Sequence, residues 1–155
     1  DAVKIEGVDI KTVDSISEGM KHADIVSCAT LSPTPLIYGK DLKPGQHLDM
    51  IGAYKPDMRE MDDEVLEKAN VYVDNMEGAT KETGDLAIPI ANGTFRVEQI
   101  KADLFELAKG EKILNRNPDD ITCFKSVGHA LEDLAAATLA FEKTEQSKTL
   151  NTLNH

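Results

Sequence analysis

Three apolar stretches of this sequence end in small or hydroxylated residues that could lie against a ligand. The endings are Cys28-Ala29-Thr30, Gly52-Ala53-Tyr54 and Lys125-Ser126-Val127-Gly128. Small residues let a flat ligand approach the backbone closely, and free N–H groups at the start of a helix can bind an oxygen or a phosphate. Small residues also serve tight turns, so one such ending alone decides nothing. Three of them in one chain favour a binding site.

Strand-like and helix-like segments alternate around these endings. The apolar patterns predict strands at about 3–5, 24–29, 47–53, 70–74 and 121–125. They predict helices after Ser15, with a first turn at 62–64, over 76–83, over 97–108 and after Ser126. This alternation is typical of an α/β fold with a parallel sheet. Because ligands of such sheets bind outside the carboxyl ends of the strands, the three endings are expected to share one site.

The composition limits the classes of protein that this chain can represent. It has 155 residues and 41% hydrophobic content, enough for one domain with a core. The net charge of −11 disfavours nucleic acid and anionic membranes as partners. No apolar run approaches the ~20 residues of a membrane span, and we expect no signal peptide. We therefore expect a cytoplasmic protein whose two cysteines are reduced rather than joined in a disulfide.

Four segments of the sequence resemble the second half of the ornithine cyclodeaminase/mu-crystallin family. They are ADIVSCAT, LKPGQHLDMIGAYKPDMREMDDEVLEKANVYVD, EGATKETGDL and ITCFKSVGHALEDLAAATLAFE. The resemblance implies part of a Rossmann-type domain, flanking helices, a long C-terminal helix and a bound NAD(P). It places the cofactor beside these residues: Cys28, Ala29, Thr30, Gly52, Ala53, Ser126, Val127 and Gly128. It also implies a homodimer acting on a small substrate derived from an amino acid.

The chain departs from the family pattern because it contains no G-x-G-x-x-G segment. In the family, that pyrophosphate loop precedes the matching residues. The resemblance therefore assigns 1–126 to the later part of the NAD(P)-binding domain. It assigns 127–146 to a helix that returns toward a substrate and dimerisation domain. Because the sequence becomes polar beyond Lys143, we expect 147–155 to be a loose tail. We expect these 155 residues to be inactive by themselves.

A second departure concerns Tyr54. The resemblance implies an aspartate at this position in the cyclodeaminases of the family. A phenol with a pKa near ~10 is a poor base at neutral pH, although it can donate a hydrogen bond. Reduction of an imine requires a hydride, a proton source and a polar wall. The resemblance thus favours a reductase of cyclic ketimines, with Tyr54 as a catalytic candidate. The alternatives are an ornithine cyclodeaminase and a mu-crystallin-like NADPH-binding protein without significant turnover.

Some charged and polar residues near these motifs allow two interpretations. Lys125 either faces the ligand or is solvated, and His129 either binds a cofactor ribose or is structural. Arg59 and Glu60 are expected to form a local ion pair or a subunit contact. The histidines and cysteines lack the spacing of metal ligands, so we expect no zinc site.

Overall fold

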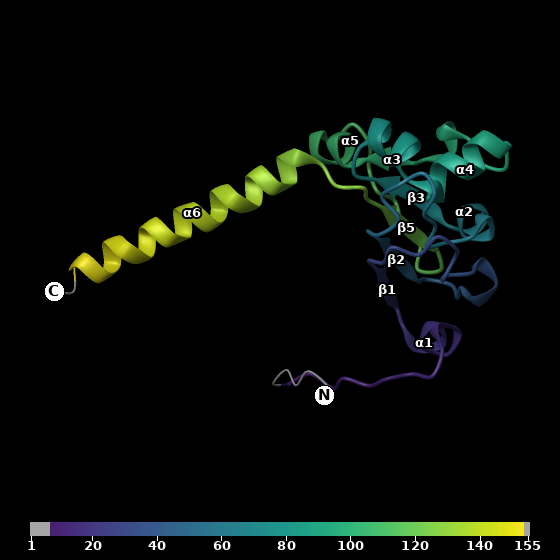
Figure 1. The fold of residues 1–155 in the computed structure, drawn as a ribbon, viewed down its shortest axis with the longest axis horizontal. Helices are drawn as coiled ribbons and strands as arrows, with labels where there is room; N and C mark the ends of the chain where they lie inside the picture. The colour runs from purple at the N-terminus through teal and green to yellow at the C-terminus, as the bar shows by residue number, and fades with distance from the viewer. Residues whose placement is uncertain (1–6, 154–155) are drawn as a thin grey trace.

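Five parallel strands form a single sheet in the computed structural model, which describes residues 7–153 (Figure 1). The strands are β1 (Ile25–Cys28), β2 (His47–Met50), β3 (Asn70–Val73), β4 (Ala102–Asp103) and β5 (Thr122–Lys125). Their order across the sheet is β1-β2-β5-β3-β4. The predicted parallel α/β fold is confirmed, and a strand expected over 3–5 lies outside the described residues.

Helices separate most of the strands, but only a 3-10 turn lies between β1 and β2. The helices are α1 (Ile16–His22), α2 (Asp63–Lys68), α3 (Met76–Glu82), α4 (Gly84–Asn92), α5 (Leu104–Lys109) and α6 (Ala130–Leu153), with 3-10 turns η1 (Gly39–Asp41) and η2 (Val97–Gln99). Several begin at a polar side chain that accepts a backbone N–H, as Ser15 does for α1 and Asp62 for α2. None of the helices in the described part of the chain is long and apolar enough to cross a membrane.

One face of the sheet is covered and the other is open. The inward side chains of β2, β3 and β5 pack against α2, α3 and α4, which Figure 1 shows together on one side of the sheet. The buried contacts involve these residues: Leu48, Met50, Val65, Leu66, Val71, Val73, Ala79, Leu86 and Cys123. The opposite face carries exposed Ile25 and half-buried His47, Tyr72 and Phe124. Because parallel sheets are normally covered on both faces, this surface is unusual for a complete domain.

The structure differs from our predictions in the middle of the chain. Gly84 does not simply close the helix predicted over 76–83, because the Thr83 hydroxyl accepts the Asp85 N–H and a second helix, α4, begins there. The helix predicted over 97–108 is divided into η2, β4 and α5. The division arises because Ala102 pairs with Tyr72 at the edge of the sheet.

The C-terminal helix also differs from our prediction. It begins at Ala130 rather than directly after Ser126, because Gly128 has a left-handed φ of 88°. The backbone is helical through Leu153, so most of the segment 147–155 is not the loose tail that we expected. Figure 1 shows α6 extending away from the sheet. Leu134 and Phe141 on this helix are accordingly exposed.

Candidate functional site

The three endings identified in the sequence meet at the carboxyl edge of the sheet. β1, β2 and β5 are neighbouring parallel strands, so the residues that follow them leave the sheet on the same side. The Ala53 N–H donates to the Thr30 carbonyl at 3.1 Å, which joins the first ending to the second. The Ser126 N–H donates to the Met50 carbonyl at 3.1 Å, which joins the third ending to β2. The predicted convergence of these segments is therefore present in the fold.

Not every residue at this edge is accessible. Ala29 and Gly128 are exposed, and Thr30 and Val127 are partly buried. The other members of the predicted set, Cys28, Gly52, Ala53 and Ser126, are buried. The first group could contact a ligand directly, whereas the second group shapes the backbone beneath it.

Tyr54 lies at the same edge, directly after the buried Ala53. Its side chain is 46% exposed, and the Lys55 ammonium lies 5.6 Å from the centre of its ring. The phenol can therefore reach a molecule bound outside the strand ends. The nearby Lys55 adds positive charge beside the ring.

The backbone N–H groups after β5 are not free, contrary to our expectation. Asp74, at the end of β3, accepts hydrogen bonds from the N–H groups of Val127 and Gly128 at 2.9 and 2.8 Å. The same oxygen accepts from the Ser126 hydroxyl at 2.9 Å. This carboxylate occupies the position that we had assigned to a ligand oxygen. The segment therefore offers a ligand its surface rather than its N–H donors.

Lys125 is neither solvated nor directed at a ligand, and this corrects both of our interpretations. Its side chain is fully buried, and its ammonium donates to the Gly52 carbonyl. The ammonium also lies 3.2 Å from Asp85 Oδ2, which forms a buried ion pair. Asp85 comes from the first turn of α4, which the sequence patterns did not reveal. The tertiary structure thus connects the end of β5 to the turn after β2.

Glu60 is a further buried acid, and the ion pair predicted between it and Arg59 is wrong. The Arg59 guanidinium instead lies 2.6 Å from Asp63. The Glu60 carboxylate accepts the Thr30 N–H, and its own backbone N–H donates to Asp85 Oδ1 at 2.8 Å. The one available signal was the position of Glu60 in the motif G-A-x-x-P-D-M-R-E, although a motif does not reveal burial.

The electrostatics of this edge follow from burial. Desolvation is the main reason that the pKa of Asp85 is raised, and the Lys125 charge only partly offsets it. Burial and the neighbouring Glu60 raise the pKa of the Cys28 thiol to about 12. Burial likewise raises the pKa of the Cys123 thiol to about 12. Both thiols are free and remain protonated at neutral pH, so neither is a nucleophile.

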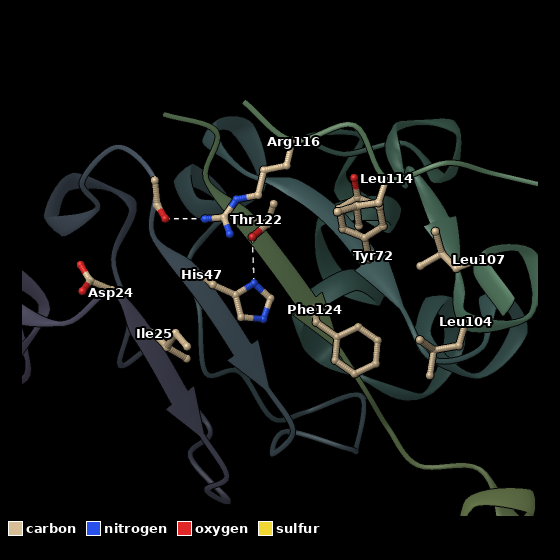
Figure 2. A pocket seen from close by; sticks show the side chains of 11 residues that line it. Asp24, Ile25, His47, Tyr72, Leu104, Leu107, Leu114, Arg116, Thr122 and Phe124 are labelled. Atoms are coloured by element: carbon tan, nitrogen blue, oxygen red, sulfur yellow. Dashed lines mark hydrogen bonds between the residues drawn. The ribbon is translucent and has the colours of Figure 1, made fainter. Parts of the chain in front are cut away.

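A hollow of about 620 Å³ lies elsewhere, on the open face of the sheet (Figure 2). Its lining is largely apolar and includes Ile25, Tyr72, Leu104, Leu107, Leu114 and Phe124. Figure 2 shows the His47 ring beside Thr122, with Nδ1 2.8 Å from the hydroxyl. Burial lowers the pKa of His47 and so favours the neutral ring. Our sequence analysis predicted no site here.

The carboxyl edge combines small residues along the backbone with one exposed phenol. A side-chain atom added at Gly128 would meet nothing within 4 Å, so the surface above this residue is open. Among the described residues, no group of three potential metal-ligating side chains occurs. These features define a part of a Rossmann-type nucleotide-binding domain.

Comparisons with known proteins agree with this class. The profile of the ornithine cyclodeaminase/mu-crystallin family matches residues 1–148, and the chain belongs to that family. It is 43% identical over 129 residues to Protein SAR DEFICIENT 4 of Arabidopsis thaliana, covering 83% of this chain and 39% of that protein. It is 38% identical over 139 residues to a Delta(1)-pyrroline-2-carboxylate reductase of Paracoccus denitrificans, covering 86% and 44%.

Solved structures show the same relation. The Delta(1)-pyrroline-2-carboxylate reductase of Thermococcus litoralis, in complex with NADH and L-proline, superposes with a TM-score of 0.86 at 38% identity. The match covers 92% of this chain and 44% of that one. The chain thus spans less than half the length of the relatives that it matches.

Proposed function

We propose that this chain is part of an NAD(P)H-dependent reductase that converts cyclic ketimines to cyclic amino acids. The substrates would be of the pyrroline-2-carboxylate or piperideine-2-carboxylate type, and the products would be proline or pipecolate. The observation that carries the proposal is the convergence of Thr30, Ala53 and Ser126 at one sheet edge beside an exposed Tyr54. The similarity to pyrroline-2-carboxylate reductases supports the substrate class.

Within this proposal, the chain holds the nicotinamide end of the cofactor. Ala29, Thr30, Val127 and Gly128 would contact it, because they are the accessible members of the predicted set. When bound, the reduced nicotinamide would supply a hydride for the carbon of the C=N bond, and the nitrogen would take up a proton from water. The Tyr54 hydroxyl would donate a hydrogen bond to the substrate and so stabilise its orientation.

The domain assignment remains part of the same proposal. Residues 1–126 would complete an NAD(P)-binding domain, and the helix after residue 127 would lead back to a substrate and dimerisation domain. The open sheet face and the exposed apolar residues of α6 support this arrangement, because both require a covering partner. A homodimer in the cytoplasm is the assembly we propose, and light scattering of the intact protein tests the oligomer.

The decisive experiment measures the consumption of NADH and NADPH by the intact protein with pyrroline-2-carboxylate. We expect loss of the nicotinamide absorbance and formation of proline, with a reduced rate in Tyr54→Phe because the hydroxyl is lost. Conversion of ornithine to proline and ammonia with catalytic NAD would identify a cyclodeaminase instead. Tight NADPH binding without turnover of any ketimine would identify a mu-crystallin-like binding protein.

The 155 residues by themselves are proposed to be inactive, because they contain no glycine-rich pyrophosphate loop. Titration of this chain with NADPH, followed by nicotinamide fluorescence, tests the point. Saturable tight binding would contradict the proposal.

A further inference from the structure

Two buried charged side chains, Glu60 and Lys125, form hydrogen bonds to the backbone of the turns at the proposed nicotinamide site. Thr30 is bonded at both backbone groups: its N–H donates to Glu60, and its carbonyl accepts from Ala53. The Gly52–Ala53 peptide is likewise bonded at both groups, because Lys125 donates to the Gly52 carbonyl. Glu60 and Lys125 thus each fix one of the two turns, and the turns also bond to each other.

Packing of the core does not by itself explain why these buried side chains are charged. Glu60, Asp85 and Lys125 are all fully buried. Burying ionised groups is costly unless they are paired, and apolar residues of similar volume commonly replace such groups without loss of stability. Asp85 connects the other two, since Oδ1 accepts from the Glu60 N–H at 2.8 Å and Oδ2 lies 3.2 Å from the Lys125 ammonium. The connection to backbone turns indicates a task beyond packing.

The turn after β2 needs such external bonds. Ala53 has a φ of 46°, a left-handed conformation that residues with a side chain rarely adopt. At Gly52, an added Cβ would overlap Glu60 and the Thr30 backbone, so the two turns approach each other as closely as the chain allows. An uncommon backbone conformation persists only where the surroundings determine it.

We propose that Glu60 and Lys125 are positioning residues that fix the Thr30 and Gly52–Ala53 turns and thereby set the depth of the nicotinamide ring. Neither side chain is accessible, so neither touches the ligand. They act through the backbone that the ring would contact. The part of the proposal that concerns the ring rests on the proposed function, whereas the fixing of the turns does not.

Two variants separate hydrogen bonding from charge. Glu60→Met keeps a similar volume and removes the acceptor of the Thr30 N–H, leaving the Asp85–Lys125 pair balanced. The double variant Lys125→Met/Asp85→Asn removes the donor to Gly52. The wild-type trio has two carboxylates and one ammonium, and the double variant has one carboxylate, so its net charge is unchanged. Val71→Ala, in the buried core of β3, is the matched control.

The first measurement is amide hydrogen exchange of the intact protein without cofactor. We expect exchange at Thr30 to accelerate by about tenfold or more in Glu60→Met, and exchange at Ala53 to do so in the double variant. The Leu48 amide in β2 serves as the internal reference. Val71→Ala should change all three amides in parallel. Unchanged exchange at Thr30 and Ala53 relative to Leu48 would overturn the proposal.

The second measurement compares the affinities for NADH and for ADP-ribose, which lacks the nicotinamide ring. We expect NADH to bind about tenfold or more weakly in both variants, because a small displacement of a binding surface has large effects. ADP-ribose affinity should stay unchanged, as should both affinities in Val71→Ala. Parallel loss of both ligands would show a merely structural role. If the wild-type protein binds neither nucleotide, the proposed function fails, and hydrogen exchange alone decides whether the turns are fixed.

Discussion

At the residue scale, the charged side chains of the segment YKPDMRE separate into two environments. Glu60 is fully buried beneath the strand ends, whereas Arg59 turns toward α2 and pairs with Asp63. Arg59 lies in the loop before α2, and its guanidinium reaches the carboxylate of the first residue of that helix. The Thr94 hydroxyl adds a second bond to Asp63, at 2.9 Å. Local ion pairing therefore follows backbone direction rather than proximity in the sequence.

The Asp63 cluster predicts a dependence of stability on pH. Partial burial opposes ionisation of Asp63, but the hydrogen bonds from Arg59 and Thr94 and the Arg59 charge outweigh it and lower the pKa below 3.8. Because the folded pKa is depressed, the stabilisation is present above about pH 4 and is lost as pH falls through the folded value. We expect Asp63→Asn to cost ~1 kcal/mol or less near neutral pH, since the pair is partly exposed.

Urea unfolding of Asp63→Asn and of the wild type between pH 6 and pH 3 checks this prediction. The two free energies of unfolding should converge as the pH decreases. A difference that is constant or that grows toward acidic pH would contradict it. Glu98→Gln, at an exposed position, is a suitable surface control.

At the element scale, the first turn of α4 contacts the loop after β2, so two of the segments that resemble the family meet there. Gly84 donates its N–H to the Lys55 carbonyl at 2.9 Å, and the next residue, Asp85, accepts from the Glu60 and Met61 N–H groups. The segment between β2 and α2 therefore folds against the start of α4. A helix that sequence periodicity did not reveal thus supports the loop carrying Tyr54.

We predict that Gly84→Ala destabilises the protein. An added Cβ would overlap the carbonyl oxygens of Pro56 and Met58, and backbone atoms cannot move aside as a flexible side chain can. Overpacking of this kind costs about 1–3 kcal/mol. Thermal unfolding measures the loss, with the exposed Glu82→Ala in α3 as the control. A Gly84→Ala protein as stable as the wild type would show that the loop does not pack here.

At the scale of the whole molecule, the sheet has one covered face and one open face. The β1 edge is unpaired among the described residues, and Ile25 on that edge is 68% exposed. The hollow of about 620 Å³ lies on the same open face. Exposed apolar edges and faces of this kind promote association with another surface. The arrangement therefore requires a cover, and further chain of the same domain is the cover that we propose.

The substitution Ile25→Lys tests the cover. In the 155-residue chain, we expect the charge to reduce aggregation without loss of stability, because the position is exposed. In the intact protein, we expect the same change to lower the free energy of unfolding by about 2 kcal/mol or more, because a buried edge would lose an apolar contact and gain a charge. Light scattering and urea unfolding measure the two effects. Equal stability of both intact proteins would mean that this edge stays exposed.

The sequence determined much of the fold, because it depends on local patterns. Apolar periodicity, the cap at Ser15 and the acidic first turn at 62–64 located β1, β2, β3, β5, α1, α2 and α3 to within a few residues. The alternation of these elements established the parallel sheet. Small residues after the strands identified the segments that meet at the carboxyl edge. β4 escaped because it has only 2 residues, and α4 escaped because it begins at a glycine and contains Pro89.

Only the tertiary structure decided how the site is held together. Three contacts join segments that are far apart in the chain. Lys125 donates to the Gly52 carbonyl, Glu60 accepts the Thr30 N–H, and Asp74 accepts N–H groups after β5. The identity of a charged residue does not state whether it faces water or another segment. That outcome is set by which strands become neighbours, and strand order arises when the whole sheet assembles.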